Sequence, residues 1–180
     1  FEGYYVTARK IDSFVYFAVN NYPRYYGIEN DEIVPRFADS LSGDEFSAEA
    51  TCSRVYYFEP IQASSFLTIA SLDMKDDDSI VNKEVILGNG QNVYASLENL
   101  YVAETSYDYG PQPLDQRIGI LPYEPGKEET MIHKFSLDDG EIEYEGNGAA
   151  HGRILNQFSM DENDDYFRIA TTIGHVSRSG

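Results

Sequence analysis

Short hydrophobic stretches, each bounded by turn-forming residues, recur along the chain. They are rich in Tyr, Val, Ile, Phe and Thr, they end at Asn, Asp or Gly, and they lack the periodicity of an amphipathic helix. The predicted strands are residues 4–11, 14–20, 66–73, 80–87, 92–97, 100–104, 131–137, 141–145, 157–161 and 166–172. A short stretch at residues 114–118 is the one helical candidate. The pattern predicts an all-β chain.

Two internal similarities indicate a repeat. Residues 69–73 are similar to residues 134–138, and residues 100–105 are similar to residues 166–171, at offsets that differ by one residue. Each repeated unit consists of a hairpin, a long connection and a second hairpin. Four-stranded units in tandem are typical of a β-propeller. A β-sandwich of the same strands is the alternative.

We therefore predict a partial β-propeller, with about two four-stranded antiparallel blades and the first hairpin of a third. The chain forms one domain over residues 1–180 in this prediction. The predicted parts are blade one at about 4–88 with an insertion at 21–64, blade two at about 92–148 with an insertion at 105–130, and the start of blade three at about 155–173. Because antiparallel strands alternate in direction, both insertions are expected on the same face.

Several ordered sequence blocks resemble a known family. They are residues 92–96 with 99–102, residues 132–137, and residues 156–162 with 167–172. These blocks are similar to those of secreted proteins with a C-terminal β-propeller domain distantly related to WD repeats. The resemblance implies an archaeal or bacterial protein, secreted or on the cell surface, and longer than this chain. It brings no catalytic residues, and the segment Ala149-Ala150-His151-Gly152 departs from the family, in which Val-Pro-Gly is more common.

The charge of the chain excludes some partners. Thirty-one acidic and 13 basic residues give a net charge of −18, so nucleic acids and anionic membrane surfaces are unfavourable partners. No apolar run approaches the roughly 18 residues of a membrane span, so we expect no membrane insertion by this segment. The single cysteine excludes an intrachain disulfide. The acidic excess favours solubility, with cation binding as the alternative.

Two acidic turns leave calcium open as a cofactor. Their candidate ligands are Asp73, Asp76 and Asp78 in the first turn, and Asp161, Asn163 and Asp165 in the second. The second turn has oxygen-bearing side chains at alternate positions, but Tyr166 and Thr172 occupy the places of the glycine and the glutamate of an EF-hand loop. Asp and Asn are also common in tight turns between strands, which is the leading interpretation.

No motif for catalysis is present. No serine lies in a Gly-x-Ser-x-Gly motif, no glycine run opens a helix, and the three histidines lack metal-site spacing. The sequence therefore predicts no catalytic residue and no other cofactor. The alternative is a propeller hydrolase acting on glycans or peptides, with a carboxylate pair such as Asp108 and Asp115 completed by blades outside this chain.

Tyrosines are the remaining functional signal. Eight of the 15 tyrosines lie in or beside the two insertions. Five of these eight are candidate contacts for a glycan or peptide, namely Tyr25, Tyr26, Tyr107, Tyr109 and Tyr123. The leading hypothesis is a noncatalytic binding or scaffold module of an exported or cell-surface protein. Its further partners are the remaining blades of the same protein, and its exposed sheet edges favour self-association of the fragment.

Overall fold

The computed structural model describes most of the chain. The described residues are 1–23, 33–39, 43–48, 55–57, 64–76, 78, 81–108, 127–164 and 166–174. Their elements are β1 (Tyr4–Ile11), β2 (Phe14–Asn21), β3 (Arg36–Asp39), β4 (Gly43–Ala48), β5 (Val55–Tyr56), β6 (Phe66–Asp73), β7 (Asn82–Leu87), β8 (Asn92–Ala95), β9 (Asn99–Asp108), β10 (Lys127–Asp138), β11 (Glu141–His151), β12 (Arg153–Ile154), η3 (Gln157–Ser159), β13 (Met160–Asn163), β14 (Tyr166–Ile169) and β15 (Thr171–Thr172).

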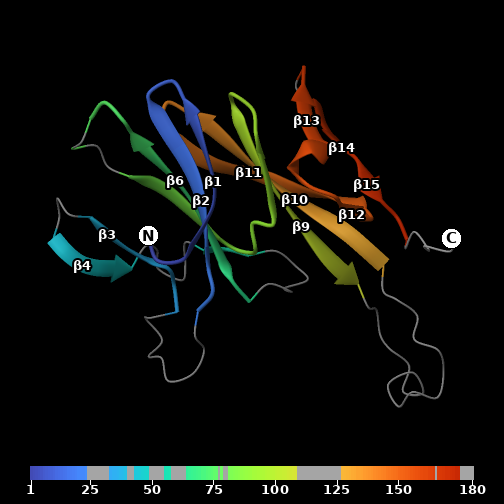
Figure 1. Cartoon of the computed structure of the whole chain (residues 1–180), viewed down its shortest axis with the longest axis horizontal. Helices are drawn as coiled ribbons and strands as arrows, with labels where there is room; N and C mark the ends of the chain where they lie inside the picture. The colour runs from blue at the N-terminus through green and yellow to red at the C-terminus, as the bar shows by residue number, and fades with distance from the viewer. Residues whose placement is uncertain are drawn as a thin grey trace, which may run out of the picture.

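The strands form two large antiparallel sheets and several smaller pairings (Figure 1). The first sheet has the order β1-β2-β6-β7-β5, in which β5 runs parallel to β7 and the other pairings are antiparallel. The second sheet has the order β11-β10-β9-β8. We call β1, β2, β6 and β7 blade one, β8 to β11 blade two, and β12 to β15 the third unit. The predicted fold class, a partial β-propeller, is confirmed.

The local sequence explains how the hairpins close. At the β10–β11 turn, Asp139 and Gly140 have φ values of 44° and 87°, and a type I′ turn requires positive φ at both central residues. Asp12 and Asp164 also have positive φ, 51° and 50°, at the β1–β2 and β13–β14 turns. Aspartate tolerates this conformation better than most residues.

The predicted strand at residues 157–161 was wrong at its start. Residues 157–159 form the 3₁₀ turn η3, and β13 begins only at Met160.

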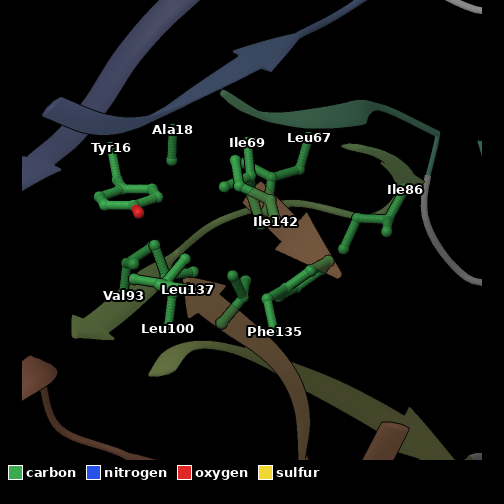
Figure 2. Packing of buried hydrophobic residues seen from close by; sticks show 11 residues of the cluster. Tyr16, Ala18, Leu67, Ile69, Ile86, Val93, Leu100, Phe135, Leu137 and Ile142 are labelled. Carbon is green, nitrogen blue, oxygen red and sulfur yellow. The ribbon is translucent and has the colours of Figure 1, made fainter. Parts of the chain in front are cut away.

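Blades one and two pack face to face around an apolar core (Figure 2). Tyr16, Ala18, Leu67 and Ile69 of blade one lie opposite side chains of blade two. The blade two side chains are Val93, Leu100, Val102, Phe135, Leu137 and Ile142. Each fully buried aliphatic or aromatic side chain of this kind contributes roughly 1.5–3 kcal/mol to folding. This interface therefore accounts for much of the stability of the described fold.

Residues 99–103 of β9, in blade two, are buried on both faces of the sheet. Along β9, Leu100 and Val102 belong to the core shared with blade one, whereas Tyr101 and Ala103 belong to a second core. The second core also contains Ile132, Ile154 and Met160, with Phe167 and Ile169 packed against it. Because successive side chains of a strand point to opposite faces, a continuous apolar run is what a strand between two layers needs. The three units are therefore stacked in chain order.

The outer face of blade one is partly covered by its own chain. The centroid of the Phe1 ring lies 5.0 Å from that of the Phe17 ring on β2 and 5.7 Å from that of the Phe37 ring on β3. The Lys83 ammonium lies 3.5 Å from the centroid of the Phe37 ring. The β3–β4 hairpin and the pairing of β5 with β7 come from the first insertion. The sequence pattern predicted neither the hairpin nor the pairing.

Both insertions begin and end on the same side of the stacked sheets. In Figure 1 the β1–β2, β8–β9, β10–β11 and β13–β14 turns lie toward the top, while β2 and β9 run down to their ends. Two hydrogen bonds show that the blades are aligned. Near the hairpin turns, Gly140 N donates to Tyr16 Oη at 2.9 Å, and at the opposite ends of the strands Asn20 Nδ2 donates to Asn89 Oδ1 at 2.8 Å. We call the side with these hairpin turns, where Gly140 lies, the hairpin side. We call the opposite side, where both insertions begin and end and where Asn20 lies, the insertion side. The arrangement agrees with the expectation from strand direction.

One of the two internal similarities is displaced by one residue. It matched Leu100 with Tyr166, yet Leu100 is buried against the preceding blade and Tyr166 is 74% exposed. The residue that occupies the position of Leu100 in the third unit is Phe167, which packs toward blade two. A slip of one residue exchanges the two faces of a strand. The similarity between residues 69–73 and 134–138 has no such error. Ile69 and Lys134 both lie on the face of their blade that is turned toward the following unit.

Candidate functional site

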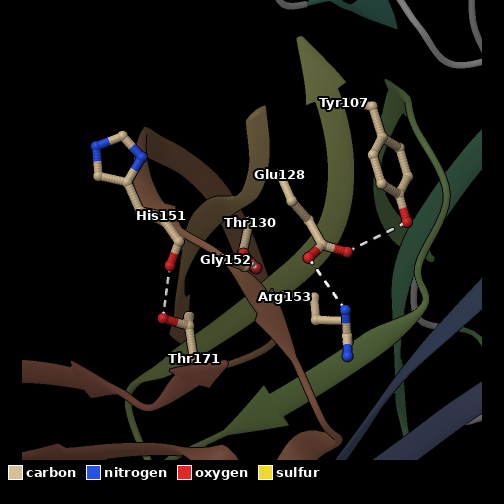
Figure 3. A network of polar contacts seen from close by, with 7 residues as sticks. All are labelled: Tyr107, Glu128, Thr130, His151, Gly152, Arg153 and Thr171. Atoms are coloured by element: carbon tan, nitrogen blue, oxygen red, sulfur yellow. Dashed lines mark hydrogen bonds and ion pairs between the residues drawn. The ribbon is translucent and has the colours of Figure 1, made fainter. Parts of the chain in front are cut away.

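A polar network joins blade two to the third unit on the insertion side (Figure 3). Tyr107 on β9 and Glu128 on β10 lie directly opposite each other, and the Tyr107 hydroxyl donates to Glu128 Oε1 at 3.3 Å. The Arg153 guanidinium on β12 donates to Glu128 Oε2 at 3.2 Å. Glu128 is the more buried member of the ion pair, with 17% of its side chain exposed. Both oxygens of the Glu128 carboxylate therefore accept a hydrogen bond. One of the two donors, Tyr107, is a predicted contact for a glycan or peptide.

Neighbouring hydrogen bonds fix the segment that carries Arg153. Thr130 Oγ1 donates to the Gly152 carbonyl at 2.7 Å, and the Gly152 N–H donates to the Glu128 carbonyl at 2.7 Å. Thr171 Oγ1 donates to the His151 carbonyl at 2.6 Å. Gly152 has a φ of 89°, and a Cβ atom there would lie 2.6 Å from the Thr172 carbonyl oxygen. The segment that departs from the resembled family thus ends in a glycine that its surroundings require.

Several exposed tyrosines lie at strand ends on the insertion side. Tyr4 begins β1 and is 70% exposed, and Tyr22 follows β2 and is 52% exposed. The rings of these two residues are in contact, with centroids 6.1 Å apart. Tyr57 follows β5 and Tyr107 lies near the end of β9, with exposed fractions of 61% and 42%. We call Tyr4, Tyr22, Tyr57 and Tyr107 the tyrosine set.

The structure places only one of the five predicted tyrosine contacts. Tyr107 lies in the tyrosine set, and the predicted contacts outside the described residues are Tyr25, Tyr26, Tyr109 and Tyr123. Tyr4 was missed because it belongs to a strand, where a packing role was favoured. Its position as the first residue of a predicted strand was the signal that could have found it. Asp108 ends β9 and Asp115 lies outside the described residues, so the suggested carboxylate pair stays a prediction.

The first acidic turn is built from local hydrogen bonds. Asp73 Oδ1 accepts from the Lys75 N–H at 3.0 Å, and Asp76 Oδ1 accepts from the Asp78 N–H at 3.1 Å. A side-chain oxygen that accepts from the backbone two residues later is the usual way in which aspartate stabilises a turn. These bonds support the turn interpretation for Asp73 and Asp76.

The second acidic turn also contains internal partners. Asp161 forms an ion pair with Arg168, and Asn163 Nδ2 donates to Asp164 Oδ2 at 2.9 Å. Asp165 lies outside the described residues. Within the described ranges, no three His, Cys, Asp or Glu residues gather as metal ligands. Calcium binding at either turn stays a prediction.

Glu162 is a hydrogen-bonding centre on the hairpin side that sequence reasoning did not single out. Its Oε1 accepts from Tyr101 Oη at 2.7 Å and from Asn99 Nδ2 at 2.8 Å, and its N–H donates to Tyr94 Oη at 3.2 Å. Tyr101 is 3% exposed. Burial, followed by the hydrogen bond to Glu162, raises the pKa of the Tyr101 phenol above its usual value. Tyr101 therefore stays a neutral donor.

A groove runs along β1 and β8, the first strands of the two blades, and along η3 and β13 of the third unit. Its middle part, about 410 Å³, is lined by β1 at Arg9, by β8 at Tyr94 and by the third unit at Phe158 and Asp161. Toward the hairpin side it joins a wider part of about 760 Å³, which shares Arg9 and Tyr94 and is also lined by Glu162. We call the two parts together the first-strand groove. It is lined by charges of both signs and by aromatic rings.

The family model of the β-propeller domain matches residues 1–180. The chain belongs to the β-propeller domain family. This agrees with the stacked antiparallel blades, which leave the propeller ring open in this chain. The described part of the propeller contains no helix with the length and hydropathy of a membrane span.

Two archaeal proteins share a short segment with this propeller. An uncharacterised protein of Archaeoglobus fulgidus is 50% identical over 46 residues, and an uncharacterised protein of Methanocaldococcus jannaschii is 47% identical over 47 residues. Each match covers 26% of this chain and 7% of the relative. No solved structure matches the chain significantly. The propeller part of the resemblance is confirmed, whereas its relation to WD repeats and its secretion stay predictions.

Proposed function

We propose that this propeller segment is a noncatalytic binding module of an exported or cell-surface protein, and that its insertion side contacts a glycan or peptide. The observation that carries the proposal is the tyrosine set, whose four rings are exposed at strand ends on one side. Tyrosine suits recognition because it combines a large rigid ring with a polar hydroxyl. Strand ends also hold such rings on a rigid scaffold.

The network around Tyr107 supports a role in binding. Its ring is 42% exposed, while its hydroxyl is held by Glu128, which in turn binds Arg153. A side chain that is ordered before the ligand arrives loses less conformational entropy on binding. The net charge of −18 favours a neutral or cationic ligand over an anionic one.

The place of the segment in a longer protein is part of the same proposal. The chain spans about 7% of the length of the relatives it matches, and exposed apolar side chains gather on the third unit. These are Leu155, Phe158, Tyr166 and Ile173, with exposed fractions of 74% or more. We propose that further blades of the same protein cover this unit. Self-association of the isolated segment is the competing outcome.

Binding measurements with matched variants test the proposal. The chain is screened against soluble glycans and peptides, with product analysis to detect turnover. Tyr4→Ala, Tyr22→Ala, Tyr57→Ala and Tyr107→Ala should each weaken the binding of a hit, while Tyr166→Ala on the hairpin side should leave it unchanged. Equal loss in the Tyr166 control would contradict the assignment to the insertion side. Turnover of a bound glycan or peptide would contradict the noncatalytic role.

A further inference from the structure

We propose that the first-strand groove binds an extended peptide, which pairs with the free edges of β1 and β8. This site is distinct from the tyrosine set, because residues 7–11 of β1 line the groove toward the hairpin side, whereas Tyr4 begins β1 on the insertion side. The groove combines three properties that fit a peptide: edge strands, oppositely charged walls and a carboxylate oriented in advance.

The edge strands supply the main-chain recognition. Among the described residues, β1 is the last strand at one end of the first sheet and β8 is the last strand at the corresponding end of the second. Ala8 and Arg9 of β1 line the middle part of the groove on one side, and Val93 and Tyr94 of β8 line the other. An edge strand offers a row of backbone N–H and C=O groups that an extended peptide can pair with. A glycan has no matching backbone repeat.

The two walls of the groove carry opposite charges. Arg9 and Lys10 lie on the β1 wall, and both are exposed. Asp161, Glu162 and Asp164 lie on the wall formed by the third unit. The Arg9 guanidinium reaches the Ala95 carbonyl of β8 at 3.5 Å, so it lies between the two edge strands. A peptide with an acidic side chain facing Arg9 and a basic side chain facing Glu162 would complement both walls.

Glu162 and Tyr94 are held in place before a ligand arrives. Glu162 Oε1 accepts from the buried donors Tyr101 and Asn99, which fixes the carboxylate and leaves Oε2 for a cationic group. The Tyr94 hydroxyl accepts from the Glu162 N–H, so its own proton can be donated to a peptide carbonyl. Such fixed polar groups provide specificity in a concave site.

Fluorescence polarisation with defined peptides tests this inference. The probes are two labelled octapeptides in which valine alternates with charged residues. In one octapeptide the lysines come before the aspartates, and in the other the aspartates come before the lysines. Each probe is also made with N-methylated backbone amides, and a neutral oligosaccharide serves as a further probe. The 180-residue chain should bind one charge order saturably and should lose at least about tenfold in affinity for its N-methylated form.

Variants of the groove decide which side chains act. Arg9→Glu should move the preference to the peptide of opposite charge order, and Glu162→Gln and Tyr94→Phe should each weaken binding several-fold. Glu143→Gln, an exposed position on β11 outside the groove, should have no effect. Circular dichroism checks that each variant is folded. Absence of saturable binding, equal binding of the N-methylated peptide, or an unchanged charge preference in Arg9→Glu would overturn the proposal, as would preferential binding of the oligosaccharide.

Discussion

The hydroxyl of Tyr101 donates a hydrogen bond to Glu162 Oε1 at 2.7 Å, which connects β9 of blade two to β13 of the third unit. The Tyr101 ring also stacks on Phe167 of β14, with ring centroids 4.1 Å apart. One side chain therefore contributes both apolar packing and a polar bond to the same interface. The bond orients the carboxylate that lines the first-strand groove, so blade packing and the proposed peptide site depend on the same residue.

Removal of this hydroxyl should destabilise the fold. Tyr101→Phe keeps the ring but leaves Glu162 with one donor fewer, and we expect a loss of about 1–3 kcal/mol in the free energy of unfolding. Urea denaturation measures the change. Tyr107→Phe is the control, because its hydroxyl bonds at the exposed surface, and we expect a loss below about 0.5 kcal/mol there. Equal losses would show that the Tyr101 bond has no special importance.

Truncation of Phe135 should open a cavity between the blades. Phe135 is fully buried and contacts the Tyr144 ring at a centroid distance of 5.3 Å. Phe135→Ala should lower the free energy of unfolding by about 3–5 kcal/mol. Phe158→Ala, at a position that is 85% exposed, should change it by less than about 0.5 kcal/mol. A small effect at Phe135 would contradict the packing of blade one against blade two.

The β10–β11 turn should tolerate no side chain at its glycine. Gly140 has a φ of 87°, and an added Cβ atom would overlap the Phe14 ring of blade one. Gly140→Ala should therefore cost at least about 1 kcal/mol in unfolding free energy. Gly148→Ala serves as the matched control, since nothing lies within 4 Å of its added Cβ. Thermal unfolding of both variants checks the difference, and equal melting temperatures would refute the steric argument.

The stability of the fold should fall in mild acid because of His133. This side chain is 1% exposed, and burial lowers its pKa to about 4 from an ordinary 6.5. The folded state therefore disfavours protonation of His133, whereas the unfolded chain takes up this proton near pH 6.5. The stability that neutral His133 contributes is full above about pH 6.5 and is lost as the pH falls toward 4. Between pH 7 and 4.5 the wild-type chain should lose about 2 kcal/mol more than His133→Gln, as measured by urea unfolding at each pH.

A parallel loss in both proteins would show that other groups dominate the acid response. His133→Gln isolates the histidine because glutamine does not titrate, while the carboxylates of the chain are common to both proteins. The comparison concerns the slope against pH, so it does not depend on the absolute stability of the variant.

Calcium should have little effect on the melting temperature. Asp73 and Asp76 already accept backbone hydrogen bonds, and Asp161 is paired with Arg168. A cation would have to compete with these partners, so we expect no shift beyond about one degree at millimolar calcium relative to EDTA. Differential scanning fluorimetry measures it. A rise of several degrees that disappears in Asp76→Asn or Asn163→Ala would establish a calcium site at the corresponding turn.

Local sequence pattern was sufficient to predict the fold class and most strands. Strands are short segments whose side chains alternate between two faces, and their turns need residues that accept positive φ, as Asp139 and Gly140 do. Because these requirements act on neighbouring residues, they are visible in the sequence. The expectation that both insertions share one side also follows from strand direction, which is a property of chain order.

Only the tertiary structure decided which distant residues meet. The pairing of β5 with β7, the β3–β4 hairpin beside Phe1, and the bonds of Glu162 to Tyr101 and Asn99 join segments far apart in the chain. Nothing in the local pattern encodes these partners, because they depend on how whole sheets stack. The similarity that matched Leu100 to Tyr166 failed for the same reason: hydrophobicity can be compared along the chain, but packing against a neighbouring blade determines which face each side chain occupies.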